Sequence, residues 1–229
     1  MFATVPAAGT SRSLLTYIAQ GREIGLIIIV LSFVAVVLIV AQLVRLRRSA
    51  LAPEESIAIL DKHLRAGQIE AAISYCDSPD NDSFLTRVMG AALLRCSRSP
   101  FGFLELKSAI EEVGQLQVAR LYRLTDGVNL IAAIAPMLGL LGTVVGMVGA
   151  FDAIRVAEGP VRPDALAGNI SQALITTVLG LIVAIPCTAA YTYLRNRIDN
   201  LTDEVGQTIE DLAAHLESTS TQPSRGPGA

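Results

Sequence analysis

The stretch APMLGLLGTVVGMVGAF, residues 135–151, is apolar throughout except for one hydroxyl, Thr143, and it is rich in glycine. The four glycines are Gly139, Gly142, Gly146 and Gly149. At about 100° per residue on a helix, Pro136 and the glycines form a wide face with almost no side-chain bulk. In lipid, small residues allow two helix backbones to approach closely, and that approach drives helix association. The stretch therefore predicts a membrane-spanning helix whose small face packs against another helix.

A second stretch, ISQALITTVLGLIVAIP at residues 170–186, presents a matching face. One side of it carries Ala173, Thr177, Gly180, Ala184 and Thr188, and the next strip carries Asn169, Thr176 and Cys187. We expect Gly180 and Ala184 to pack against the glycine helix. The threonines allow two interpretations. Each hydroxyl can bond its own backbone one turn earlier, or Thr143 and Thr177 can face a pore that contains water or a partner.

The composition is that of a membrane protein. Of the 229 residues, 52% are hydrophobic and only 17% are charged, whereas soluble domains carry roughly 25% charged residues. The net charge of −3 includes no basic block, so we expect no nucleic-acid partner. Three cysteines without a CxxC or Cys/His cluster predict neither a zinc site nor a disulfide framework. We expect no metal and no cofactor. We also expect no enzymatic activity, because GLLGTVVG lacks the GK[ST] ending of a phosphate loop.

Three runs are long enough to span a bilayer, for which about 20 apolar residues are needed. Arginines flank the runs at 45–48, 120–123 and 195–197, and they predict which segments lie in the cytoplasm. The expected order is a short periplasmic segment 1–23, a span 24–44, a cytoplasmic helical domain 45–127, a span 128–151, a periplasmic loop 152–169, a span 170–193, a cytoplasmic helical extension 194–217 and a disordered tail 218–229. The lipid bilayer is thus an expected partner.

The segments expected in the cytoplasm read as helices. Helical signals cover residues 53–64, 68–76, 84–96 and 101–127, and the last of these could run into the second span. Beyond the third span, apolar residues recur in steps of three and four, close to a heptad repeat. They are Leu194, Ile198, Leu201, Val205, Ile209, Leu212 and Leu216. This seam predicts that the third span continues as a packed helix.

The second and third spans contain no carboxylate, lysine or histidine. A proton path through a membrane needs a titrating group. If protons pass along these two helices, a partner must bring the acid.

Together, APMLGLLGTVVGMVGAF and ISQALITTVLGLIVAIP resemble the paired signature of the MotA/TolQ/ExbB proton-channel family. Three spans with the long cytoplasmic segment between the first two resemble the ExbB/TolQ branch. The fold that this implies is an all-α integral membrane protein with three transmembrane helices and a helical cytoplasmic domain, assembling as a ring-shaped oligomer. The match covers about residues 128–197.

The resemblance implies a ring of copies, five in the better-known members, around a single-span partner of the ExbD or TolR type. An aspartate of that partner would carry the proton, and a TonB- or TolA-type protein would transmit the work. The family threonines correspond to Thr143 and Thr177. The family often has a glutamate where this chain has Gln172. The residues expected to line the path are Thr143, Thr177, Thr176, Gln172 and Asn169.

The chain is thus expected to be a stator subunit that uses the proton motive force for envelope transport or tethering. A membrane scaffold whose packed helices conduct nothing is the alternative. A neighbouring gene for a short single-span protein with an aspartate in its span would favour the stator. The hydroxyls are compatible with protons or with sodium.

Overall fold

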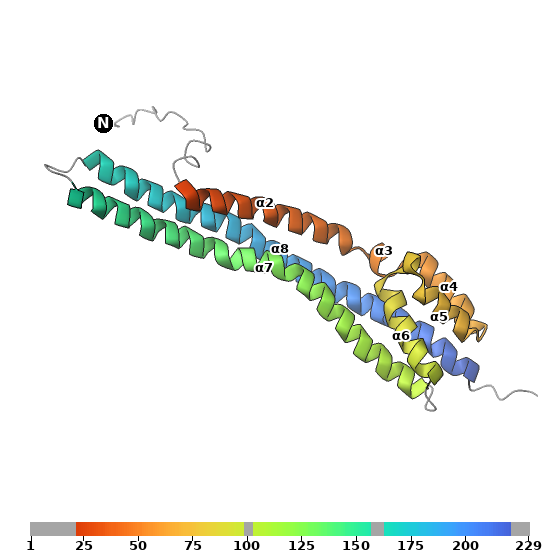
Figure 1. The fold of residues 1–229 in the computed structure, drawn as a ribbon. Helices are drawn as coiled ribbons and strands as arrows, with labels where there is room; N and C mark the ends of the chain where they lie inside the picture. The colour runs from red at the N-terminus through yellow and green to blue at the C-terminus, as the bar shows by residue number, and fades with distance from the viewer. Residues whose placement is uncertain (1–21, 99–102, 157–162, 221–229) are drawn as a thin grey trace, which may run out of the picture. The chain divides into compact units, whose positions relative to one another are not determined.

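A computed structural model describes residues 22–98, 103–156 and 163–220, and it is helical throughout these ranges, without a strand (Figure 1). The elements are α2 (Arg22–Arg45), α3 (Arg48–Leu51), α4 (Glu54–Arg65), α5 (Ile69–Asp77), the 3₁₀ turn η1 (Pro79–Asn81), α6 (Phe84–Arg98), α7 (Phe103–Val156) and α8 (Pro163–Ser220). Three helices are long and apolar enough to cross a membrane: Ile24–Arg45 in α2, Glu105–Asp152 in α7 and Ala167–Leu216 in α8. The chain is therefore a multi-pass membrane protein.

The chain divides into two compact units. We call residues 1–39 and 127–191 the span unit, and residues 40–126 and 192–229 the helical unit. Helices α2, α7 and α8 each contribute a segment to both units.

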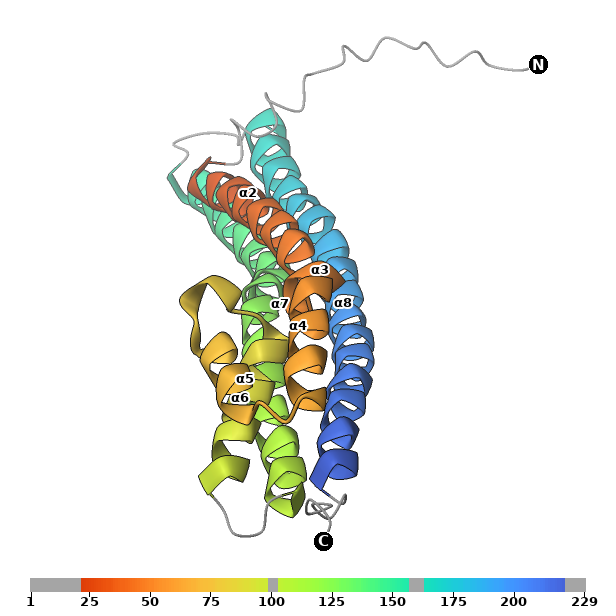
Figure 2. The same cartoon turned by 90° about the vertical axis from the view of Figure 1, so that its right-hand side faces the viewer.

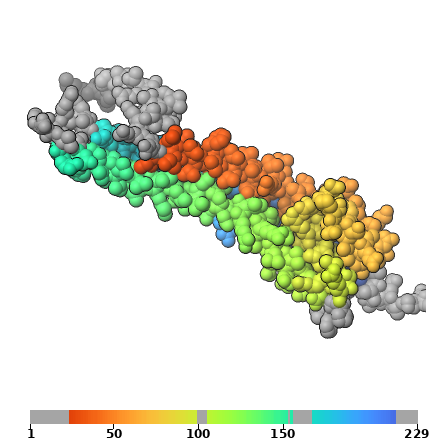
Figure 3. All heavy atoms as spheres, viewed as in Figure 1, coloured from red at the N-terminus to blue at the C-terminus, as the bar shows by residue number. Residues whose placement is uncertain are grey.

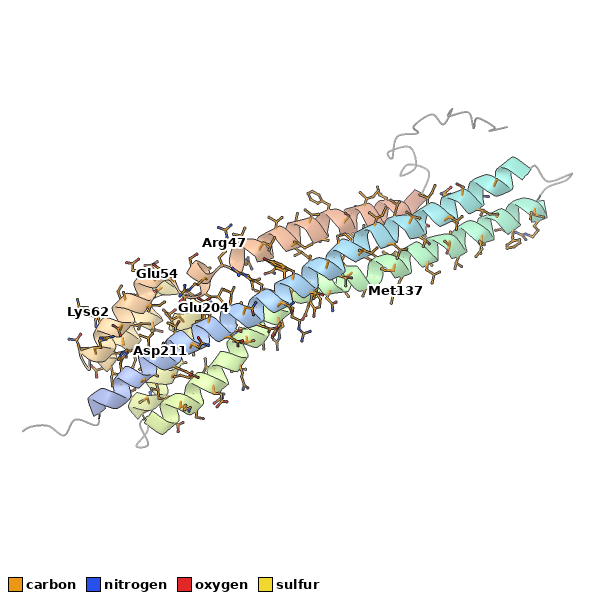
Figure 4. The ribbon with its side chains drawn as sticks, turned by 180° about the vertical axis from the view of Figure 1, so that it is seen from behind. Arg47, Glu54, Lys62, Met137, Glu204 and Asp211 are labelled. Atoms are coloured by element: carbon orange, nitrogen blue, oxygen red, sulfur yellow. The ribbon has the colours of Figure 1, made fainter. Side chains whose placement is uncertain are left out.

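In the span unit, α2 packs on α7 and α8 through a small buried cluster. Its members are Ala35, Val128, Ile131, Ala132 and Cys187. The outward faces are apolar: Phe33 of α2 is 72% exposed and Met137 of α7 is 67% exposed. Met137 lies on the face of α7 that points away from α8 (Figure 4). Apolar side chains of this kind suit contact with lipid, and the helices satisfy their own backbone polar groups there.

In the helical unit, α3–α6 pack with the nearer parts of α7 and α8 around a larger core. Figures 2 and 3 show α4, α5 and α6 gathered together. All seven residues of the predicted α8 seam are buried, from 0% exposure at Leu194 to 9% at Leu216. The seam packs against helices of its own chain, and it therefore holds the helical unit together.

Local sequence explains the ends of the short helices. Proline precedes α4, Glu54 and Glu55 lie in its first turn, and Arg65 lies in its last, as the helix dipole favours. Gly67 turns the chain toward α5 with a φ of 69°, a conformation that suits glycine. The backbone N–H of Thr86 donates to the Ser83 hydroxyl (3.2 Å) and so caps α6.

Polar contacts join the long helices inside the helical unit. The Gln42 side chain, 4% exposed, donates from Nε2 to the Leu124 carbonyl (2.8 Å). The Tyr122 hydroxyl donates to Asp199 of α8, and the Arg195 guanidinium lies 5.4 Å from the centre of the Tyr122 ring. The Gln42 bond joins α2 to α7, and the two contacts of Tyr122 set the register of α7 against α8.

Two predicted boundaries differ from the structure, and the possibility that the helix signal at 101–127 runs into the second span is confirmed. The expected loop 152–169 is shorter, because α7 continues to Val156 and α8 already begins at Pro163. The tail expected to be disordered from 218 is helical as far as Ser220. The signal at 101–127 and the second span form one helix, α7, which begins at Phe103. Most of the predicted N-terminal segment, residues 1–21, and the rest of the tail, 221–229, lie outside the described residues.

Candidate functional site

The two glycine-rich stretches meet within the span unit, where α7 and α8 come close enough that a methyl group would not fit. A Cβ added to Gly180 would lie 2.5 Å from the Ala135 carbonyl oxygen. One added to Gly139 would lie 2.9 Å from the Thr177 Cα. Both obstacles are backbone atoms, so no rotamer change relieves them. Glycine at these two positions sets the distance between the helices.

The glycine contact continues along α7. A Cβ on Gly142 would overlap the Thr176 hydroxyl, and one on Gly146 would lie 2.6 Å from the Ala173 Cβ. Gly149 differs: a Cβ there meets nothing within 4 Å. Within one chain, the glycine contacts therefore end at Gly146, although Ala150 one turn further is still buried. Helix packing at Gly149 stays a prediction.

Thr177 forms a hydrogen bond between the two helices. Its half-buried hydroxyl donates to the Gly139 carbonyl across the contact (2.9 Å). The geometry requires glycine at 139, because a Cβ there would displace the Thr177 backbone and so break the bond. Thr177 thus stabilises the α7–α8 contact, whichever pore role it also has.

Thr143 and Thr188 bond their own helices instead. The half-buried Thr143 hydroxyl donates to the Leu140 carbonyl (2.6 Å), and Thr188 donates to the Ala184 carbonyl (2.9 Å). These bonds match the first of the two interpretations of the threonines. A hydroxyl oxygen that donates in this way still has lone pairs with which to accept a bond.

The structure corrects the expectation for Thr176. This residue is 3% exposed, and its hydroxyl donates to the Ala173 carbonyl (2.7 Å) inside the α7–α8 contact. A side chain enclosed in this way packs against the partner helix and does not line an open path. The helical wheel placed Thr176 on the strip next to the one that carries Thr177. It could not show how closely α7 approaches Thr176.

The other predicted residues lie around this contact. Gln172 and Asn169 are half-buried on α8, and the Asn169 carbonyl would lie 3.2 Å from a Cβ on Gly146. Pro136 is half-buried within α7, and Ala184 is buried on α8. The structure brings together side chains that offer hydroxyls and amides, and none of them titrates.

The sequence reasoning missed the backbone partners at the site. The Gly139 carbonyl accepts the Thr177 hydroxyl, and the Ala135 carbonyl lies where a Cβ on Gly180 would be. No residue type signals a carbonyl. The missing side chain at Gly139 was the one sign that its backbone would be accessible.

A family model for the MotA/TolQ/ExbB proton channel family matches residues 82–207, more than half of the chain. The chain belongs to the MotA/TolQ/ExbB proton channel family. The match includes α6, all of α7 and the part of α8 that carries Gly180. The contact between α7 and α8 is therefore part of what the family model describes.

Named members of the MotA/TolQ/ExbB family resemble shorter stretches of the chain. An ExbB homologue of Methanothermobacter thermautotrophicus is 40% identical over 101 residues, 44% of this chain and 35% of its own length. The biopolymer transport protein exbB1 of Vibrio cholerae is 34% identical over 89 residues, 39% of each chain. The ExbB of Neisseria gonorrhoeae is 40% identical over 87 residues, 38% of this chain and 39% of its own. The matched stretches thus span less than half of these relatives.

Proposed function

We propose that the chain is the pore-forming stator subunit of a proton-driven motor in a bacterial inner membrane. Copies form a ring, with five as the expected number, around a single-span partner of the ExbD or TolR type. An aspartate in the span of that partner carries the proton. The motor drives envelope transport or tethering, with a TonB- or TolA-type protein as the element that transmits the work.

One observation carries this proposal. The tightly packed pair of helices carries hydroxyls that bond the α7 carbonyls of Gly139 and Leu140, yet residues 128–151 and 170–193 contain no carboxylate, lysine or histidine. Polar groups at membrane depth usually serve the protein interior or a transport path. A path lined in this way needs an acid from another chain, and a partner aspartate supplies it.

Thr143 and Thr177 take different parts in this scheme. The Thr143 hydroxyl is held by a carbonyl of its own helix, so it can accept from a protonated carboxyl without a change in helix packing. It can also rotate to donate to the ionised carboxylate. The Thr177 hydroxyl is held by the Gly139 carbonyl and keeps the two helices at a fixed distance. We therefore assign proton exchange mainly to Thr143 and positioning mainly to Thr177.

The proposed orientation places the N-terminus in the periplasm and the C-terminus in the cytoplasm. Each of the three spans is followed or preceded within a few residues by arginine in the helical unit: Arg45 on α2, Arg123 on α7 and Arg195 on α8. Basic residues beside spans favour the cytoplasmic side. An impermeant thiol reagent should label Ile154→Cys in intact cells and Asp80→Cys only after lysis. Reversed labelling would contradict the orientation.

Co-purification tests the assembly. The chain, expressed with the single-span protein encoded beside it, should elute as one complex whose native mass fits about five copies plus the partner. A scaffold of the same fold would form oligomers without that partner. Isolation of the chain as a monomer in mild detergent, with the partner absent, would contradict the proposal.

A further inference from the structure

A groove lies in the helical unit between α4 and α8. It encloses about 350 Å³, with Ile57, Ala58 and Leu212 as its apolar lining. The Arg48–Glu204 pair (3.2 Å) joins α3 to α8, and the pair of Asp61 with His215 (3.4 Å) joins α4 to α8. On α8 the lining runs from Thr208 to His215, seven residue steps or roughly 10 Å at 1.5 Å per residue. The groove is thus long enough to receive about two turns of a helix.

Carboxylates line both sides of this groove. Glu54 of α4 and Asp211 of α8 face it, and Figure 4 shows both on the side seen from behind. Within the described ranges, neither of these two makes an ion pair, whereas Asp61 is bonded to Arg65 (2.8 Å). An acidic groove repels a second acidic groove, so two copies would not join groove to groove. The occupant should instead be basic.

The same unit offers exposed basic side chains on α6 and α7. Arg98 ends α6 and Lys107 lies in the second turn of α7. Over the part of the chain that the structure describes, neither has an ion-pair partner, whereas Arg95 is bonded to Glu112 (2.6 Å). The groove side thus carries Glu54 and Asp211, with Lys62 next to Asp61, and the α6–α7 side carries Arg98 and Lys107, with Glu105 and Glu111 close to Lys107 in the chain.

Lys107 and Asp211 lie at one level along the unit. The contact of Tyr122 with Asp199 fixes the register of the two antiparallel helices. From that contact, Lys107 is 15 residues along α7, or about 22 Å, and Asp211 is 12 residues along α8, or about 18 Å. The difference is less than one helical turn. In a ring whose axis follows the helices, surfaces at the same level meet.

We propose that the α4–α8 groove receives the α6–α7 surface of a second copy, with Glu54 and Asp211 facing Arg98 and Lys107 of that copy. This inference rests on the proposed ring. To that ring the inference adds which two surfaces of neighbouring copies join, and that the contact is head-to-tail. Head-to-tail contacts close into a ring when the rotation allows it, whereas groove-to-groove pairing would stop at a dimer. Glu111, one turn from Lys107, weakens the attraction, so Glu111→Gln should strengthen the contact.

Charge reversal tests the pairing in the full chain. Asp211→Lys and Lys107→Asp should each raise the protein concentration at which the ring half-dissociates, by about fivefold or more, since exposed ion pairs contribute up to about 1 kcal/mol. The double variant should recover most of the loss. Glu210→Lys, which makes the same change on the neighbouring residue of α8, should have little effect. Equal effects of Asp211→Lys and Glu210→Lys, or no recovery in the double variant, would overturn the inference.

Cysteine cross-linking tests the geometry independently. In a background without native cysteines, Ala58→Cys in the groove and Ser108→Cys beside Lys107 should form disulfides between copies. A chain with both should give a ladder up to the full ring, and each single variant should give no ladder. An intact ring by native mass with no ladder would overturn the inference and leave the proposed function standing. A monomer by native mass would overturn both. If Asp211→Lys instead releases the single-span partner and leaves the ring intact, the groove belongs to that partner.

Discussion

Replacing Gly180 by alanine should force α7 and α8 apart. The new Cβ would lie 2.5 Å from the Ala135 carbonyl oxygen, about 0.9 Å short of the 3.4 Å at which ordinary contact begins. A separation of that size would lengthen the Thr177–Gly139 bond from 2.9 Å to roughly 3.8 Å, which is no longer a hydrogen bond. The control is Gly149→Ala, where the methyl group meets nothing within 4 Å.

The expected change in the stability of the α7–α8 contact combines three contributions. Overpacking costs about 1–3 kcal/mol, and the hydrogen bond between helices in a membrane contributes roughly 0.6 kcal/mol. Alanine returns up to about 1 kcal/mol through its better helix propensity. We therefore expect Gly180→Ala to destabilise the α7–α8 contact by about 1–3 kcal/mol, and Gly149→Ala to be neutral or slightly stabilising.

The assay follows the separation of the two helices. Dyes on Met147→Cys and Ser171→Cys, both exposed positions in the span unit, report it by energy transfer as SDS is titrated into the purified protein. Gly180→Ala should shift the midpoint to lower SDS, and Gly149→Ala should not. Equal midpoints for the two variants would refute the conclusion that glycine sets the helix separation.

Three further predictions concern single side chains. Thr177→Val should lower the stability of the same contact by roughly 0.6 kcal/mol, and Thr143→Val should not, because only Thr177 bonds the other helix; equal SDS midpoints would contradict this. Ile209→Asp should destabilise the helical unit by several kcal/mol in thermal unfolding, since the Ile209 side chain is 1% exposed. Asp203→Asn should change the stability by no more than about 0.5 kcal/mol. An Ile209→Asp variant of unchanged stability would refute the packed seam. Burial raises the pKa of the Cys76 thiol to about 11, which leaves less thiolate at neutral pH. The rate of Cys76 alkylation in the folded protein should therefore rise up to about pH 11. A plateau of that rate near pH 8.5 would indicate an exposed thiol.

Periodicity was enough to predict most of the fold. Apolar length located the three spanning helices, and steps of three and four located the α8 seam. Both patterns indicate which face of a helix avoids water or packs closely. They can be recognised in the sequence because the period of a helix is fixed. The ends of the helices were less predictable. Residues 152–156 and 163–169 are polar or rich in glycine and proline, so they resemble a loop although they continue α7 and α8.

The sequence predicted the contact between α7 and α8 but not the partner of each threonine hydroxyl. Small residues signalled that α7 and α8 touch, because only a close approach needs them. Whether a threonine hydroxyl bonds its own helix or the neighbouring helix depends on differences in position of less than 1 Å. Thr143 and Thr177 look alike in the sequence, yet one bonds Leu140 and the other Gly139. Thr176, expected at the pore, is enclosed because Gly142 lets its hydroxyl approach the α7 backbone.

Proton flux into liposomes tests the central claim most directly. The purified chain with its single-span partner should acidify the lumen under an imposed membrane potential, as a trapped pH-sensitive dye would report. The chain alone should conduct nothing, because its second and third spans hold no titrating carboxylate, lysine or histidine. Exchanging the partner's span aspartate for asparagine should abolish the flux while the complex stays assembled. The same flux from the chain alone, or a current carried by sodium and independent of pH, would contradict the claim.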